Sequence, residues 1–208
     1  MEPTDVNRRM FDETHRRRSD GSSSLPPIVK QTLRDLAGKS VLHLHCGSGE
    51  GSAELAEQGA TVTAVDVDEP LLDAAREQWP SILWIPADPQ SLPANLRRAR
   101  FDLVYSPEGV LGSLTDVDAW AAGVAASLRR NGELLVFDDH PVALCVDGLL
   151  RWHGDYFDDG IVRLGRIVTT LVRAGFRVEA LEEYPLDSAG RRSDRRIPGS
   201  FLLYATRA

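Results

Sequence analysis

The sequence predicts an α/β protein with a doubly wound, mostly parallel seven-stranded sheet, an antiparallel C-terminal strand pair, and helices on both faces. Short apolar runs alternate with segments of helical periodicity from residue 40 to residue 137. Strands that alternate with helices pair in parallel through right-handed crossovers. After Gly175, two strand-like runs follow one another with no helix between them, and such a pair is expected to be antiparallel.

Local patterning places the strands and helices of this sheet. The parallel strands are expected at 40–45, 61–66, 82–85, 101–106 and 133–137, and the closing pair at 176–184 and 201–206. Helices are expected from 26 to 38, from the glycine-rich turn to 59, and over 69–79, 115–130 and 161–174. Thr115 or Asp116 would cap its helix, and Gly175 would end the last one. The polar stretch that ends at Arg100 has some helical character.

Length and composition favour one compact domain. The chain has 208 residues, 42% of them hydrophobic and 26% charged, which suits a single domain over residues 25–208. Residues 1–24 end in a serine- and glycine-rich run typical of a flexible segment. Met10, Phe11 and His15 could instead form a short helix that closes as a lid, although a frayed terminus is the simpler expectation.

The bulk properties also exclude several classes of protein. No run approaches the roughly 20 apolar residues of a membrane span, and the first residues lack the apolar core of a secretory signal. The two cysteines, Cys46 and Cys145, are too few for a disulfide framework and favour a reducing, cytoplasmic compartment. A net charge of -7 argues against a nucleic-acid partner. The arginines at 16–18 and 191–196 are expected on solvated faces or loops.

A glycine-rich turn and an acidic residue point to a nucleoside ligand. The turn, Cys46 to Gly51, follows the first strand, and Asp66 ends the second strand about twenty residues later. Glycines let the backbone approach a ligand closely, while a carboxylate in this position accepts hydrogen bonds from ribose hydroxyls. These two features alone would also fit an enzyme that binds a nicotinamide dinucleotide.

Three details favour a nucleoside-sulfonium ligand over a dinucleotide. A dinucleotide fingerprint has glycine three positions after Gly49, where this chain has Ser52. The third strand ends at Ala87 and Asp88, and the carboxylate there can accept a hydrogen bond from an adenine amino group. The antiparallel C-terminal pair is foreign to the usual dinucleotide domain.

With these residues in place, the chain resembles the class I (Rossmann-like) S-adenosylmethionine-dependent methyltransferases. The stretch from Val41 to Arg76 is similar to the first two motifs of that family, and the strands at 101–105 and 133–136 follow in the same order. The start Val-Leu-His-Leu-x-Cys, the His-Pro after the fifth strand and the run from Ile197 resemble a bacterial subgroup. The resemblance implies methyl transfer to an O or N atom of a small-molecule acceptor, with S-adenosylhomocysteine as the product. A monomer or homodimer is expected, with no membrane or nucleic-acid partner.

The resemblance also implies a set of cofactor-binding residues. Gly47 and Gly49 would line the methionine portion, Asp66 would hold the ribose, Asp88 the adenine, and Ser106 would face the methionine end. The full predicted set is His45, Cys46, Gly47, Gly49, Asp66, Val67, Asp88, Pro89 and Ser106.

Two positions depart from the family pattern. His43 stands where the family commonly has an acidic residue that helps to hold the methionine moiety, and His45 where it commonly has glycine. Both histidines would project from one face of the strand, as a pair of metal ligands does. Since no third ligand is apparent nearby, no metal is expected. Cys46 is expected to be a small packing residue rather than a nucleophile.

The acceptor side is expected beyond the fifth strand. His140 is the preferred general base because imidazole titrates near neutral pH, and Glu108 is a second candidate. A structural histidine beside Pro141 is the alternative reading of His140. Residues 142–160 hold Trp152, His153 and Tyr156, which suggest a substrate lid, although a packed connector is an equal alternative.

Two other functions remain open from the sequence. A nicotinamide-dependent oxidoreductase could use the same scaffold, because a fold does not determine the reaction. A non-catalytic S-adenosylmethionine-binding module is favoured by the altered positions His43 and His45.

Overall fold

The computed structural model describes residues 24–147, 149–186 and 194–208. Its seven-stranded sheet has the order β3-β2-β1-β4-β5-β7-β6. Strands β1 to β5 pair in parallel, whereas β7 is antiparallel to both β5 and β6, so the predicted sheet is confirmed. The strands are β1 (Ser40–Leu44), β2 (Thr61–Asp66), β3 (Leu83–Pro86), β4 (Phe101–Ser106), β5 (Leu128–Asp139), β6 (Phe176–Leu186) and β7 (Asp194–Arg207).

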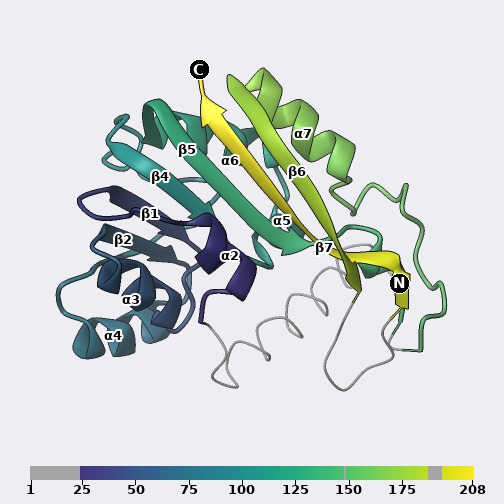
Figure 1. Ribbon diagram of the computed structural model, residues 1–208, viewed down its shortest axis with the longest axis horizontal. Coiled ribbons are helices and arrows are strands. Elements are labelled where there is room, and N and C mark those ends of the chain that lie inside the picture. The colour runs from purple at the N-terminus through teal and green to yellow at the C-terminus, as the bar shows by residue number, and fades with distance from the viewer. Residues whose placement is uncertain (1–23, 148, 187–193) are drawn as a thin grey trace.

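Helices cover both faces of the sheet (Figure 1). One apolar cluster lies between the sheet and the first three helices, and a second lies between the sheet and the last three. The doubly wound arrangement is therefore confirmed. The helices are α2 (Pro27–Thr32), α3 (Glu50–Glu57), α4 (Glu69–Gln78), α5 (Val110–Ser113), α6 (Val117–Ser127) and α7 (Leu164–Arg173), with a 3-10 turn η1 (Ala143–Cys145).

Side-chain caps and a glycine set three helix limits, and those at Asp116 and Gly175 are as the sequence predicts. The Asp68 side chain accepts a hydrogen bond from the Leu71 N–H at the start of α4, and Asp116 does the same for Ala119 in α6. Gly175, which follows the C-cap residue Ala174 of α7, has a left-handed φ of 91°, which a glycine adopts without steric cost.

Three expected helices differ from the structure. The helix expected over 26–38 ends at Thr32, and Asp35 beyond it has a left-handed φ of 56°, which a right-handed helix does not accommodate. The segment 87–100 forms turns without a regular helix. The helix expected over 115–130 ends at Ser127, because β5 begins at Leu128 and pairs there with β4.

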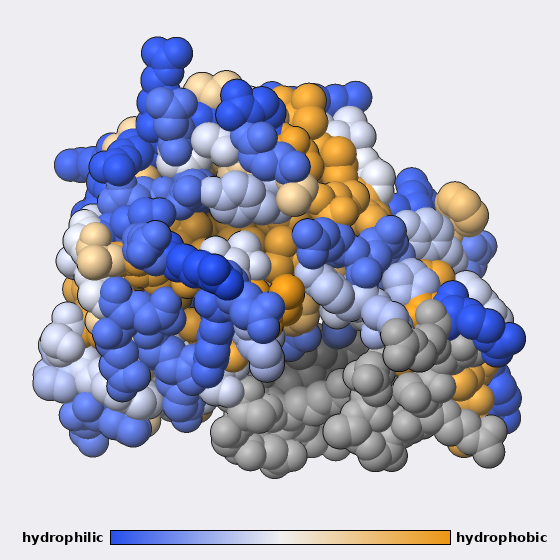
Figure 2. Space-filling view, in the orientation of Figure 1, coloured by the Kyte–Doolittle hydropathy of each residue, from blue (hydrophilic) through white to orange (hydrophobic). Residues whose placement is uncertain are grey.

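Three further expectations concern the N-terminal lid, membrane-spanning helices and the character of the surface. The proposed lid residues Phe11 and His15 lie outside the described residues. Within the described part of the chain, no helix is long and apolar enough to cross a membrane. Hydrophilic side chains dominate the surface over α3 and α4, whereas apolar side chains reach the surface near β6 and α7 (Figure 2).

Candidate cofactor and acceptor site

The glycine-rich turn is joined directly to the end of β2. The backbone N–H of Gly47 donates to Asp66 Oδ2 at 2.8 Å, and the N–H of Asp68 donates to Asp66 Oδ1 at 3.1 Å. Ala87, after β3, donates its N–H to the Asp66 carbonyl at 2.9 Å. The Asp66 side chain is fully buried. Through its carboxylate and its main-chain carbonyl, Asp66 joins the carboxyl ends of β1, β2 and β3 in one place.

The backbone of this turn has three residues in the left-handed region. His45, Gly47 and Gly49 have φ values of 48°, 56° and 98°. A Cβ built on Gly49 would lie 2.6 Å from Trp84 Cη2, so glycine is required there by the approach of β3 as well as by φ. His45 occupies a conformation that favours glycine, the residue common at this position in the resembled family, so histidine is held here at a conformational cost.

His43 and Ser52 form a buried pair across the turn. His43 Nδ1 lies 2.7 Å from the Ser52 hydroxyl, and the imidazole stacks on Tyr105 with ring centroids 5.0 Å apart. Ser52 stands in the first turn of α3, where the dinucleotide fingerprint has glycine. The two unusual residues of this motif are thus partners, which sequence spacing alone did not suggest. In the described residues, no group of three histidine, cysteine or acidic side chains is placed to hold a metal ion.

The other residues predicted to bind a cofactor lie along the carboxyl edge of the sheet. Val67 follows Asp66 and is 53% exposed, while Pro89 is buried and Asp88 partly buried. Asp88 accepts the N–H of Gln90 at 2.8 Å. At the end of β4, Ser106 is fully buried, and its hydroxyl has no hydrogen-bond partner among the described residues.

These groups fit a nucleoside that carries a polar tail. An ionised carboxylate has about four acceptor positions, so Asp66 keeps acceptor positions for ribose hydroxyls beyond its two backbone contacts. The exposed Val67 side chain offers apolar surface for a flat base, and Asp88 offers an acceptor. The buried Ser106 hydroxyl lacks a partner within residues 24–147, 149–186 and 194–208, and buried hydroxyls normally have one.

Asp138 at the end of β5 lies just beyond the predicted fifth strand, where the acceptor side is expected, although the sequence assigned it no role. It is buried, and it accepts the N–H groups of Gly109 and Leu111 at 2.7 and 2.9 Å, which fixes the loop after β4 that carries Glu108. Burial, together with the charge of Asp139, raises the pKa of Asp138 to about 7. A carboxylate directly after an apolar strand was the available signal.

His140 has both ring nitrogens engaged. The N–H of Val142 donates to Nδ1 at 3.1 Å, and Nε2 lies 2.9 Å from Glu183 Oε1 on β6. The side chain is 7% exposed, and burial lowers the pKa of His140, although the Glu183 carboxylate opposes this shift. His140 is therefore held between the end of β5 and the edge strand of the sheet by contacts at both ring nitrogens.

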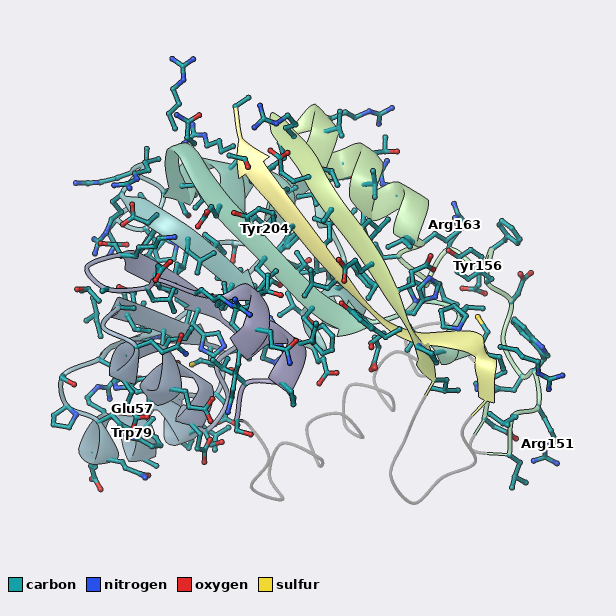
Figure 3. All side chains as sticks on the ribbon, in the orientation of Figure 1. Glu57, Trp79, Arg151, Tyr156, Arg163 and Tyr204 are labelled. Atoms are coloured by element: carbon teal, nitrogen blue, oxygen red, sulfur yellow. The ribbon has the colours of Figure 1, made fainter. Side chains whose placement is uncertain are left out.

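The aromatic segment 142–160 lies at the margin of the molecule beyond β6 and β7. Figure 3 shows Tyr156 near Arg163 there, on the opposite side of the view from Glu57 and Trp79. Trp152 is 62% exposed, and His153 is exposed as well. Tyr156 is partly buried and packs edge-to-face on Phe157. The lid role of this segment stays a prediction.

Comparisons with known proteins agree with this geometry. Residues 41–132, from β1 to the middle of β5, match the model of a methyltransferase domain family. A malonyl-[acyl-carrier protein] O-methyltransferase of Pseudescherichia vulneris is 33% identical over 108 residues, which are 49% of this chain and 42% of that protein. A ubiquinone biosynthesis O-methyltransferase of Coxiella burnetii is 34% identical over 103 residues, 48% of this chain and 43% of its own length. This chain thus spans less than half of the curated relatives that it matches.

Solved structures share the fold over a longer range. An S-adenosylmethionine-dependent methyltransferase from Mesorhizobium loti has a TM-score of 0.72 at 24% identity, covering 90% of this chain and 99% of its own. A similar protein from Listeria monocytogenes has a TM-score of 0.70 at 22% identity, covering 86% and 94%. The chain has the fold of the class I methyltransferases. The resemblance predicted from the sequence is therefore confirmed: the fold is shared, and residues 41–132 are similar to the methyltransferase domain family.

Proposed function

We propose that this protein is an S-adenosylmethionine-dependent methyltransferase that methylates an O or N atom of a small molecule. The observation that carries the proposal is the junction of the Gly47 N–H with the buried Asp66 carboxylate, inside a fold shared with enzymes of that class. The matched relatives named above are O-methyltransferases, which supports oxygen as the acceptor atom. The proposed setting is the cytoplasm, with the protein as a monomer or homodimer and no nucleic-acid partner.

In this proposal each part of the site has a limited task. S-adenosylmethionine, when bound, supplies a methyl group that is already electrophilic because it is attached to a sulfonium. Asp66 would bind the ribose hydroxyls, Val67 would pack on the adenine, and Ser106 would donate to the methionine end. The turn and the β4 loop would exclude water and align the acceptor, and such alignment supplies much of the rate in a displacement of this kind.

Cofactor binding by calorimetry tests the proposal. S-adenosylmethionine and S-adenosylhomocysteine should both bind, and Asp66→Asn and Asp66→Ala should weaken binding by about 1.5–3 kcal/mol, roughly tenfold to a hundredfold in Kd. Asp73→Ala serves as the matched control, because Asp73 lies on the exposed side of α4 and pairs with Arg76. Absence of heat at high micromolar cofactor would overturn the assignment.

Acceptor identity requires a separate assay. Catechol, octanoate and benzylamine represent phenol, carboxylate and amine acceptors, and transfer of a labelled methyl group to one of them is expected. Tight cofactor binding without transfer to any acceptor would favour the alternative of a non-catalytic binding module. A larger thermal shift with NAD(P)H than with S-adenosylmethionine would favour the oxidoreductase.

A further inference from the structure

The hydrogen bonds of His140 define its tautomer. Because the Val142 N–H donates to Nδ1, that nitrogen carries the lone pair and the ring proton resides on Nε2. Nε2–H then donates to Glu183 Oε1 at 2.9 Å. In this arrangement no lone pair of His140 is left to accept a proton from an acceptor molecule.

Glu183 has the complementary properties. Its side chain is 51% exposed, and one oxygen is held by His140, while Oε2 has no partner among residues 24–147, 149–186 and 194–208. Within the described part of the chain, Glu183 is therefore a half-exposed carboxylate with one oxygen fixed by His140 and one oxygen without a partner. A buried donor that fixes a half-exposed carboxylate orients it without the entropy cost of ordering a free side chain at the moment of binding.

The sheet register places Glu183 near the carboxyl edge of the sheet, where the candidate site lies. Glu183 is paired with Phe201 on β7, and Phe201 is paired with Asp138 on β5. Directly paired residues point to the same face, and neighbouring strands are about 4.8 Å apart, so Glu183 lies about 10 Å from Asp138 along one row. Asp138 in turn holds the loop that follows β4.

We infer that Glu183 is the carboxylate that receives the acceptor's O–H or N–H group, and that His140 is its positioning residue, an inference that rests on the proposed methyl transfer. The acceptor atom forms a bond to the methyl carbon, and the carbon–sulfur bond breaks with its electron pair staying on sulfur. The acceptor's proton passes to Oε2 of Glu183. These roles reverse the expectation that His140 itself is the base.

Other charged groups surround this pair. Their positions decide which variants can serve as controls. The charged or titratable side chains on the elements around His140 are Asp138 and Asp139 on β5, Cys145 on η1, Glu182 and Tyr184 on β6, and Arg196 on β7. Glu182 is bonded to the Tyr184 hydroxyl, and Glu179, nearer the start of β6, is bonded to Arg177 and Thr206. Glu179→Gln is therefore a matched control on the same strand.

The first test needs no acceptor. Long-range ¹H–¹⁵N correlation spectra of the free protein report the imidazole tautomer, and His140→Gln assigns the signal. We expect the Nε2–H form, and we expect the ring to titrate at a lower pH than an ordinary histidine. In Glu183→Gln this midpoint should fall further, because the Glu183 carboxylate favours the charged ring. An Nδ1–H form with a free Nε2 would overturn the positioning role and return His140 to the role of base.

The second test uses the labelled-methyl assay. Glu183→Gln should lower kcat by about 10²- to 10⁴-fold with catechol and benzylamine, which lose a proton, and leave octanoate unchanged. His140→Gln should retain more activity than His140→Ala, because the glutamine amide N–H reaches as far as Nε2. The effects of His140→Ala and Glu183→Gln on kcat should not be additive. Glu183→Gln behaving like Glu179→Gln would overturn the inference. If no variant or wild type transfers methyl, the proposed function fails, while the tautomer result still decides how His140 and Glu183 are arranged.

Discussion

Replacing Gly49 by alanine would add one methyl group to the turn between β1 and α3. Gly49 has a φ of 98°, in the left-handed region. The added Cβ would lie 2.6 Å from Trp84 Cη2 and 3.1 Å from the Ala75 Cβ. Both neighbours are buried, so neither can move into solvent to make room.

Two costs follow from this geometry. A residue with a Cβ loses about 1–2 kcal/mol in the left-handed conformation. Inserting a methyl group into a packed interior costs about 1–3 kcal/mol, because side chains or backbone must shift. The sum, about 2–5 kcal/mol, is a large part of the roughly 5–15 kcal/mol that stabilises an ordinary domain. We therefore expect Gly49→Ala to be strongly destabilising.

Urea unfolding followed by circular dichroism measures this change. Gly165→Ala is the matched control, since Gly165 lies in α7 with nothing within 4 Å of an added Cβ. In a helix, that substitution should be neutral or stabilise by up to about 1 kcal/mol. The Trp84→Phe background separates the two costs of Gly49→Ala. Phenylalanine lacks Cη2, so the penalty there should fall to the backbone part of about 1–2 kcal/mol.

Two results would refute the reasoning. A Gly49→Ala variant as stable as Gly165→Ala would mean that neither the close approach of Trp84 nor the positive φ matters. An equal penalty in the wild-type and Trp84→Phe backgrounds would exclude the contact with Trp84 as a cause and leave only the backbone conformation of Gly49.

Two further predictions concern stability. His45→Gly should be more stable than His45→Ala by about 1 kcal/mol, because both remove the imidazole and only glycine is free of strain at a φ of 48°. Paired urea unfolding curves measure the difference, and a more stable alanine variant would contradict the prediction. Asp138 has a pKa raised to about 7, so the folded protein binds its proton where the unfolded chain, with an ordinary carboxyl pKa of about 3.9, does not. The contribution of protonated Asp138 to the free energy of unfolding is fully present below about pH 4. It is lost as the pH rises towards and through 7, by at most about 1.4 kcal/mol per pH unit. Asp138→Asn should abolish that slope in unfolding measurements between pH 5 and pH 8, and equal slopes would count against the raised pKa.

Much of the fold could be predicted from local sequence patterns. Apolar runs such as 101–106 match β4 residue for residue, because a fully buried parallel strand needs a continuous apolar run bounded by turn residues. The antiparallel end of the sheet followed from the absence of a helix between two strands. The limits of α2 and α6 were less predictable, because Asp35 adopts a left-handed conformation and Leu128 joins β5, and neither event has a local signature.

The sequence by itself determined the class of fold, the glycine-rich turn and the acidic residue that follows it, because glycine and strand-end carboxylates have local causes. Only the tertiary structure decided which groups face each other. The pairing of His43 with Ser52, and of His140 with Glu183, joins residues 9 and 43 positions apart whose contact depends on helix packing and strand register. His140 looked like a base in the sequence because imidazole titrates near neutral pH. In the fold, a backbone N–H and a carboxylate occupy its two nitrogens, and the exposed group is Glu183.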